Sequence, residues 1–120
     1  KHELKSAIIY LNISMKVPEN TVLHGDINSL VQVINNMISN SIQAYNGKPN
    51  QTIDLIVDEK DNNIIISIVD YGSGITTKGK NGTGLGLYMS YSTIKAHFGG
   101  DITFESEEGK GTIFHIILPL

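Results

Sequence analysis

The sequence predicts an α+β sandwich in which two long helices cover one face of a sheet of about five mostly antiparallel strands. Five short runs are rich in isoleucine and valine or alternate between apolar and polar residues, as strands do. Two longer runs carry apolar residues at helical spacing. Two short polar stretches, EKDNN and EEGKG, join consecutive strand runs and indicate hairpins.

The N-terminal third contains one strand and one long helix. In residues 7–15 the apolar side chains of Ile9, Leu11, Ile13 and Met15 alternate with other residues and predict a strand. A helix is expected over 26–46, with Asp26 as its N-cap. At about 100° per residue its apolar stripe consists of Ile27, Leu30, Val31, Ile34, Met37, Ile38, Ser41, Ile42 and Tyr45.

The remaining elements follow in order along the chain. Strands are expected at 52–58 and 63–70, joined by the turn EKDNN. A second helix is expected over 84–100 and ends at the glycine pair 99–100. Strands at 101–106 and 112–120 flank the turn EEGKG.

Composition limits the classes of function. The 120 residues, 40% of them hydrophobic, suit one domain with its own core, and no run is long enough for a membrane span. No signal-peptide pattern opens the sequence, and cysteine is absent, which excludes disulfides and thiolate metal sites and suits a reducing compartment. The net charge of −3 argues against nucleic acid as the main partner.

The first long helix carries a strip of uncharged amides opposite its apolar stripe. The strip consists of Gln32, Asn36, Asn40 and Gln43, and residues 27–46 contain no charged side chain. A solvated outer face is the alternative, but such faces are usually rich in Lys and Glu, and asparagine is a poor helix former. The strip therefore favours a lined pocket.

Two glycine-containing stretches add to this pattern. In IVDYGSGI (68–75), Asp70 ends an apolar strand, and Gly72 and Gly74 follow at alternate positions. Taken alone this is an ordinary turn, although a half-buried carboxylate needs a hydrogen-bond donor such as an amino group. In NGTGLGL (81–87) the glycines precede a helix, where backbone N–H groups bind phosphate.

In sequence order, Gln32-x3-Asn36-x3-Asn40, DYGSG, GTGLGL and GKGTIFHIILP resemble the ATP-binding domain of sensor histidine kinases over nearly the whole chain. The resemblance implies the Bergerat fold, which gyrase B subunits, MutL-type repair proteins and the large heat-shock chaperone share. It implies that ATP lies between the two helices and a lid, over the sheet.

The resemblance also implies roles for individual residues. Asn40 looks like the Mg²⁺ ligand, since its amide oxygen is a hard donor, and Asn36 like a second contact to the metal and phosphates. Asp70 would accept the adenine amino group, with Gly72 and Gly74 beside the ring, and Thr112 would reach the adenine pocket. The phosphates would meet the N–H groups of Gly82, Thr83, Gly84, Leu85 and Gly86.

The chain departs from the family pattern at three places. Gln32 stands where many members have a carboxylate, and Gln43 where several have a lysine, which puts a cationic contact from this helix in doubt. The phenylalanine-containing lid box is missing, and TTKGKN (76–81) resembles only its tail. We expect that lid residues are missing from the sequence near Ile75–Thr76, with the numbering closed up over them, and that Lys78 belongs to a mobile lid. A natural or engineered short lid is the alternative.

The four histidines are expected to be structural or exposed. His2 lies in HELKS, which resembles a phosphoacceptor box, but about thirty residues leave no room for a helical hairpin before the amide-bearing helix. Residues 1–6 are therefore interpreted as the end of a preceding helix or linker, and 7–120 as the ATP-binding domain. His24, His97 and His115 show no metal-ligand spacing.

Three functions follow from the resemblance. The first is transfer of the γ-phosphoryl group of Mg²⁺-ATP to a histidine on a separate dimerisation domain, with a response regulator downstream. The others are a hydrolytic ATPase of the same fold and a regulatory nucleotide-binding module. ATPases of this fold have a glutamate four residues before the metal asparagine; here Asn36 cannot act as a base, and we identify no general base. We expect a cytoplasmic domain, free or part of a membrane-anchored kinase, without direct membrane or nucleic-acid contact.

Overall fold

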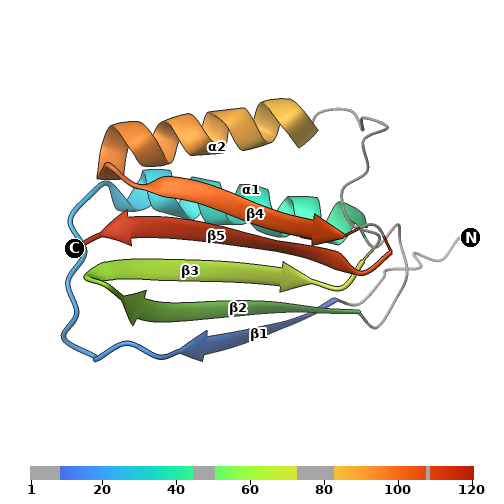
Figure 1. Ribbon diagram of the computed structural model, residues 1–120, viewed down its shortest axis with the longest axis horizontal. Coiled ribbons are helices and arrows are strands. Elements are labelled where there is room, and N and C mark those ends of the chain that lie inside the picture. Colours follow the sequence, from blue (N-terminus) through green and yellow to red (C-terminus); the bar gives the residue numbers. More distant parts are fainter. Residues whose placement is uncertain (1–8, 45–50, 73–82, 108) are drawn as a thin grey trace, which may run out of the picture.

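The chain forms one five-stranded sheet with two helices packed on one of its faces (Figure 1). The computed structural model describes residues 9–44, 51–72, 83–107 and 109–120. The helices, α1 (Ile27–Ala44) and α2 (Thr83–Phe98), lie side by side. The predicted fold class is confirmed. No helix in the described ranges has the length and apolar character that crossing a bilayer requires.

The sheet is mixed, with the strand order β1-β2-β3-β5-β4. The edge strand β1 (Ile9–Met15) runs parallel to β2 (Gln51–Lys60), whereas all other neighbouring strands are antiparallel. The central strands are β3 (Asn63–Asp70) and β5 (Gly111–Pro119), and β4 (Asp101–Glu107) forms the second edge. The parallel pair arises because α1 returns the chain to the other end of the sheet between β1 and β2.

Local sequence signals set the ends of these elements. The β2–β3 hairpin closes at Asp61 and Asn62, whose φ angles of 54° and 67° are those of a turn with two left-handed residues. Asp26 caps α1: its carboxylate accepts the Asn28 N–H at 3.2 Å and the Ser29 hydroxyl at 2.8 Å. Gly99, at φ 66°, ends α2, and its N–H donates to the Lys95 carbonyl.

The core lies between the helices and the isoleucine-rich central strands. From α1 it receives Leu30, Val33 and Met37, and Ile94 of α2 packs into the same cluster. Each fully buried aliphatic side chain contributes about 1.5–3 kcal/mol to folding. Packing against the central strands therefore stabilises the arrangement in which these side chains of α1 and α2 are buried.

The predicted apolar stripe of α1 is only partly right. Val33 is buried although the prediction omitted it, whereas Ile27, Val31 and Ile42 of the predicted stripe are exposed. The buried side of α1 is rotated around the helix axis relative to the predicted stripe, because α1 packs over β3 on one side and against α2 on the other. A helical wheel gives the width of an apolar face but not the positions of its neighbours.

The alternation in β1 predicts a strand correctly but not its burial. Leu11, Ile13 and Met15 are in register with Ile53, Leu55 and Val57 and so share the helix-facing side of the sheet. Even so, Ile13 is 61% and Met15 64% exposed. The reason is that β1 lies at the edge of the sheet, beyond the part that α1 and α2 cover (Figure 1).

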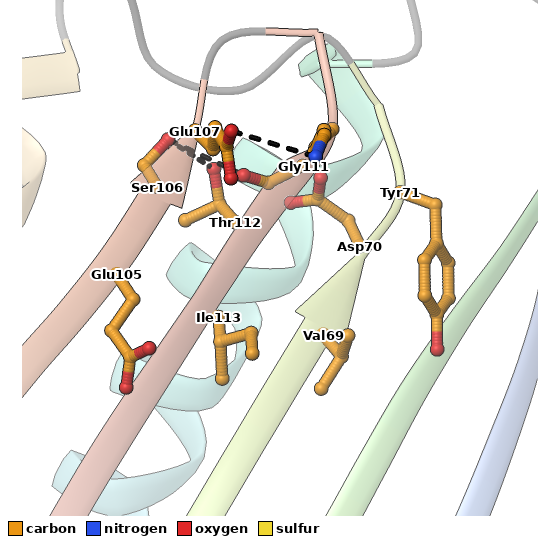
Figure 2. Close-up of a pocket in the computed structure, with 10 residues that line it drawn as sticks. Val69, Asp70, Tyr71, Glu105, Ser106, Glu107, Gly111, Thr112 and Ile113 are labelled. Carbon is orange, nitrogen blue, oxygen red and sulfur yellow. Dashed lines mark hydrogen bonds and ion pairs between the residues drawn. The ribbon is translucent and has the colours of Figure 1, made fainter.

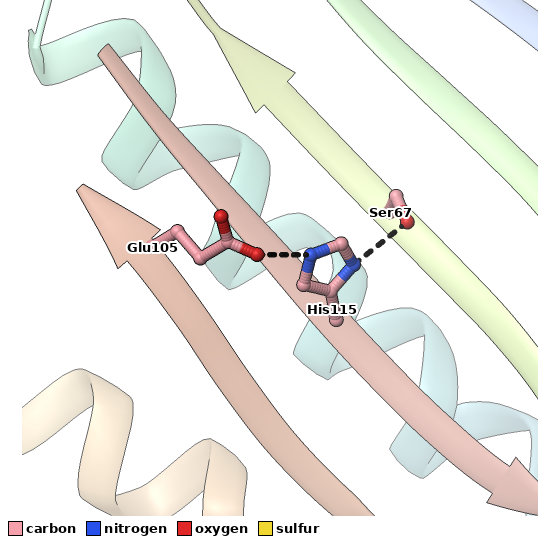
Figure 3. A network of polar contacts seen from close by, with 3 residues as sticks. All are labelled: Ser67, Glu105 and His115. Carbon is pink, nitrogen blue, oxygen red and sulfur yellow. Dashed lines mark hydrogen bonds and ion pairs between the residues drawn. The ribbon is translucent and has the colours of Figure 1, made fainter. Parts of the chain in front are cut away.

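A polar network crosses the face of the sheet that points away from the helices (Figure 3). His115 of β5 lies between Ser67 of β3, with Nδ1 2.9 Å from the hydroxyl, and Glu105 of β4, with Nε2 3.5 Å from the carboxylate. The network links three adjacent strands. His115 thus contacts neighbouring strands on the face opposite α1 and α2.

Candidate functional site

Five segment ends meet at one end of the molecule (Figure 1). They are the C-terminal part of α1, the ends of β3 and β4, the start of β5 and the N-terminus of α2. The residues predicted to contact a nucleotide lie on or next to these segments. The N-terminus of α2 carries a partial positive charge and unpaired N–H groups, which suit an anion.

Among the residues that the structure describes, Asp70 is the most deeply buried charged residue at this end. Only 2% of its surface is exposed, at the last position of β3, and its carboxylate accepts the Gly72 N–H at 3.0 Å. Burial raises the pKa of Asp70, and the N–H groups of Gly72 and Thr112 and the Ser41 hydroxyl offset part of that rise. A carboxylate held here is a ready acceptor for a ligand amino group.

Thr112 lies directly beside Asp70 in the sheet. The two residues are register partners on β5 and β3, and Thr112 is almost completely buried. Its hydroxyl lies 3.0 Å from the hydroxyl of Ser106 on β4, as Figure 2 shows. The structure therefore brings Asp70 and Thr112 together, as the resemblance implies.

A pocket of about 350 Å³ opens at the same end of the sheet (Figure 2). Asp70 and Thr112 line it, but so do Val69, Tyr71 and Ile113, whose side chains belong to the face opposite the helices. It therefore adjoins the candidate site from the face of the sheet opposite α1 and α2.

The two asparagines of the amide strip lie on the flank of α1 rather than opposite its core face. Both are half-buried, whereas Gln32 is exposed. The amide nitrogen of Asn36 donates to the hydroxyl of Ser90 on α2 at 3.1 Å. The strip is thus partly covered, because α2 packs along this side of α1.

Asn40 and Ser41 carry buried polar atoms without a hydrogen-bond partner among the described residues, namely the Asn40 amide nitrogen and the Ser41 hydroxyl. The Ser41 hydroxyl lies close enough to Asp70 to lower its pKa, but its geometry does not complete a hydrogen bond. Orphaned buried groups of this kind are rare and point to a ligand or ordered water.

A magnesium ion that arrives with a nucleotide would be held by the amide oxygen of Asn40, since the amide nitrogen can only donate hydrogen bonds. The described residues contain no cluster of three or more His, Cys, Asp or Glu that would hold a metal by itself. Mg²⁺ needs oxygen ligands and usually takes them from phosphates and water, with few from the protein. One amide oxygen, such as that of Asn40, would therefore be a sufficient protein contribution.

Several predicted site residues cannot be compared with the structure. Gly74, Lys78 and Gly82 lie outside the described residues, as do His2 and the segment in which we expect missing lid residues. For five others only the backbone is described: Gln43 lies in the last turn of α1, and the first turn of α2 consists of Thr83, Gly84, Leu85 and Gly86. Gly72 is described and donates to Asp70.

Three polar residues at this end were absent from the predicted site. Ser90 and Ser106 hydrogen-bond to predicted site residues, and Ser41 was predicted as part of the core stripe. The signal for Ser41 was its place beside Asn40. For Ser90 and Ser106 the sequence gives no local signal, because each contacts a residue on another element.

Comparison with known proteins identifies the family. The family model for "Histidine kinase-, DNA gyrase B-, and HSP90-like ATPase" matches residues 25–120. Sporulation kinase E of Bacillus subtilis is 39% identical over 105 residues, which cover 78% of this chain and 14% of that protein. Sensor protein SrrB of Staphylococcus aureus is 34% identical over 137 residues, which cover 99% of this chain and 23% of that protein.

The chain thus spans less than a quarter of the length of these two relatives. The alignment with SrrB is longer than the 120 residues of the chain, so SrrB has residues that this chain lacks.

Solved structures give the same result. Histidine kinase AdeS of Acinetobacter baumannii superposes with a TM-score of 0.73 at 25% identity, covering 94% of this chain and 55% of that one. The mycobacterial sensor histidine kinase MprB superposes with a TM-score of 0.75 at 21% identity, covering 92% of this chain and 81% of that one, and supports the fold alone. The chain belongs to the histidine kinase-, DNA gyrase B- and HSP90-like ATPase family, as an ATP-binding catalytic domain of the histidine-kinase type.

Proposed function

We propose that this domain binds Mg²⁺-ATP between α1 and α2 and transfers the γ-phosphoryl group to a histidine on a separate dimerisation domain of the same parent protein. Residues 7–120 form the ATP-binding domain in this proposal, and 1–6 the end of a preceding helix or linker. A response regulator acts downstream. The parent protein works in the cytoplasm or at its membrane boundary.

The nucleotide is held by three groups of residues. The Asp70 carboxylate accepts the adenine amino group, with Gly72 and Gly74 beside the ring and Thr112 in the same pocket. The first turn of α2 and the preceding Gly82 give N–H groups to the phosphates, and Lys78 approaches them from the lid. Asn40 gives its amide oxygen to Mg²⁺, which neutralises phosphate charge as the γ-phosphoryl group is transferred.

The observation that carries the choice of reaction is the amide at position 36. Asn36 lies on the flank of α1 that faces α2 and donates to Ser90. An amide cannot take a proton from water, so position 36 does not supply the base that hydrolysis needs. A histidine nitrogen attacks the γ-phosphorus with its own lone pair; the P–N bond forms as the bond to the bridging oxygen breaks, and ADP leaves.

The test is to mix the chain with Mg²⁺, γ-labelled ATP and the histidine-bearing domain of the parent protein. We expect label on a histidine of that domain, in an acid-labile bond, and none with Asn40→Ala. Rapid release of free phosphate without the acceptor would favour the ATPase. Binding of ATP without any transfer would favour the regulatory module.

A further inference from the structure

One hydrogen bond ties the two helices together beside the candidate site. Ser90 of α2 is 2% exposed, and its hydroxyl accepts the amide N–H of Asn36 of α1 at 3.1 Å. The two residues are 54 positions apart in the sequence. The bond therefore exists only because α1 and α2 pack side by side.

The bond determines which way the Asn36 amide points. An asparagine amide is planar and has donors at its nitrogen and an acceptor at its oxygen. When the nitrogen donates to Ser90, rotation about the Cβ–Cγ bond is fixed, and with it the direction of the oxygen. Without this partner the amide could rotate, and an NH₂ group turned toward a cation is repelled by it.

The position of Ser90 connects this amide to the phosphate end of α2. Ser90 lies about two turns after Thr83, the first residue of α2, and on the same face of the helix. Asn40 lies one turn beyond Asn36 on the same flank of α1. Ser90 thus joins the helix that carries the amides to the helix whose N-terminus contacts the phosphates in the proposed function.

We infer that Ser90 is a positioning residue for the nucleotide: its hydroxyl holds Asn36 with the amide oxygen directed to the Mg²⁺–triphosphate group. The inference rests on the proposed function, because it takes the contact of Asn36 with that group as given. Ser90 itself touches neither ligand. Its effect is transmitted through Asn36.

The experiment measures ATP affinity by calorimetry in the full chain, with Mg²⁺ and with a chelator. Ser90→Ala should weaken ATP binding in Mg²⁺ by about fivefold, the size of one lost hydrogen bond, and change it less than twofold in chelator. Ser90→Cys fills the same space with a weak hydrogen-bond partner and should behave like Ser90→Ala. Ser90→Thr retains the hydroxyl and should restore the affinity.

Two controls make the result specific. Ser92→Ala changes a serine on the opposite side of α2 and should have no effect. In an Asn36→Ala background, Ser90→Ala should cause no further loss, because the residue through which it acts is gone. Equal loss with and without Mg²⁺, or full loss in the Asn36→Ala background, would overturn the inference.

The outcome is independent of the transfer reaction. If ATP binds but no histidine is labelled, the proposed phosphotransfer fails, and the Mg²⁺-dependent affinities still decide the role of Ser90. If Asn36→Ala leaves those affinities unchanged, the role of Asn36 fails and the inference about Ser90 fails with it.

Discussion

The buried position of the Asp70 carboxylate suits the binding of a ligand but lowers the stability of the folded state. It is almost completely buried at the end of β3, and its described hydrogen bond comes from a backbone N–H rather than a cation. Burial raises its pKa above the ordinary value of 3.8. The folded state then binds more protons than the unfolded state, so stability falls as pH rises through the window between the two pKa values.

We therefore expect Asp70→Asn to have opposite effects on binding and folding. ATP affinity should fall by about 1–3 kcal/mol, because the carboxylate that accepts the adenine amino group is lost. Thermal stability at pH 7 should rise, because no buried charge remains, and the gain should shrink as pH falls toward 3.8. Calorimetry and thermal unfolding measure the two effects.

Asp58→Asn, at an exposed carboxylate on β2, is the matched control and should change neither quantity. Unchanged ATP affinity in Asp70→Asn would refute the adenine contact.

Asn36 is the residue at which we expect one substitution to increase ATP hydrolysis. Asn36→Glu places a carboxylate where ATPases of this fold have their base. It should raise the slow intrinsic hydrolysis by on the order of tenfold, less than the 10²–10⁴ of an optimally placed base. Phosphate release without acceptor measures the rate.

Asn35→Glu, on the exposed side of α1, should leave hydrolysis unchanged. Fast hydrolysis by the unmodified chain would contradict the proposed reaction.

At the scale of elements, α1 depends on its cap, because its first turn carries no acidic residue inside the helix. The Ser29 hydroxyl and the Asn28 N–H lower the pKa of Asp26. A lowered pKa means that the stabilisation is present above the ordinary value of 3.8 and is lost as pH falls through the folded-state pKa.

Asp26→Ala should consequently lower the melting temperature at pH 7, since two donors lose their acceptor. The difference from the unmodified chain should narrow below pH 3.8. Asp26→Asn, which retains a side-chain oxygen acceptor, should lose less. A pH-independent difference would show that the charge of Asp26 has no part in the cap.

At the scale of the whole molecule, the site depends on a close approach between two central strands. Gly111, at φ 124°, precedes Thr112 on β5, and an added Cβ would lie 2.2 Å from the carbonyl oxygen of Asp70. At Gly109, whose φ is 86°, an added Cβ would have no heavy atom of the described residues within 4 Å. The turn and the strand start therefore require glycine for different reasons.

The pair makes a direct comparison possible. Gly109→Ala should cost only its backbone strain, about 1–3 kcal/mol in urea unfolding. Gly111→Ala should cost more and also weaken ATP binding, because the end of β3 that carries Asp70 must move. Equal costs for the two variants would mean that the β3–β5 contact is not tight.

The sequence by itself determined the elements, their order and the cap of α1, because propensity, periodicity and turn chemistry act over a few neighbouring residues. The tertiary structure alone decided which residues are covered. It buried Val33 and left Ile13 and Met15 exposed, because burial depends on which element packs opposite. It also paired Asn36 with Ser90 and Thr112 with Ser106, because contacts between elements arise only when strands and helices pack together.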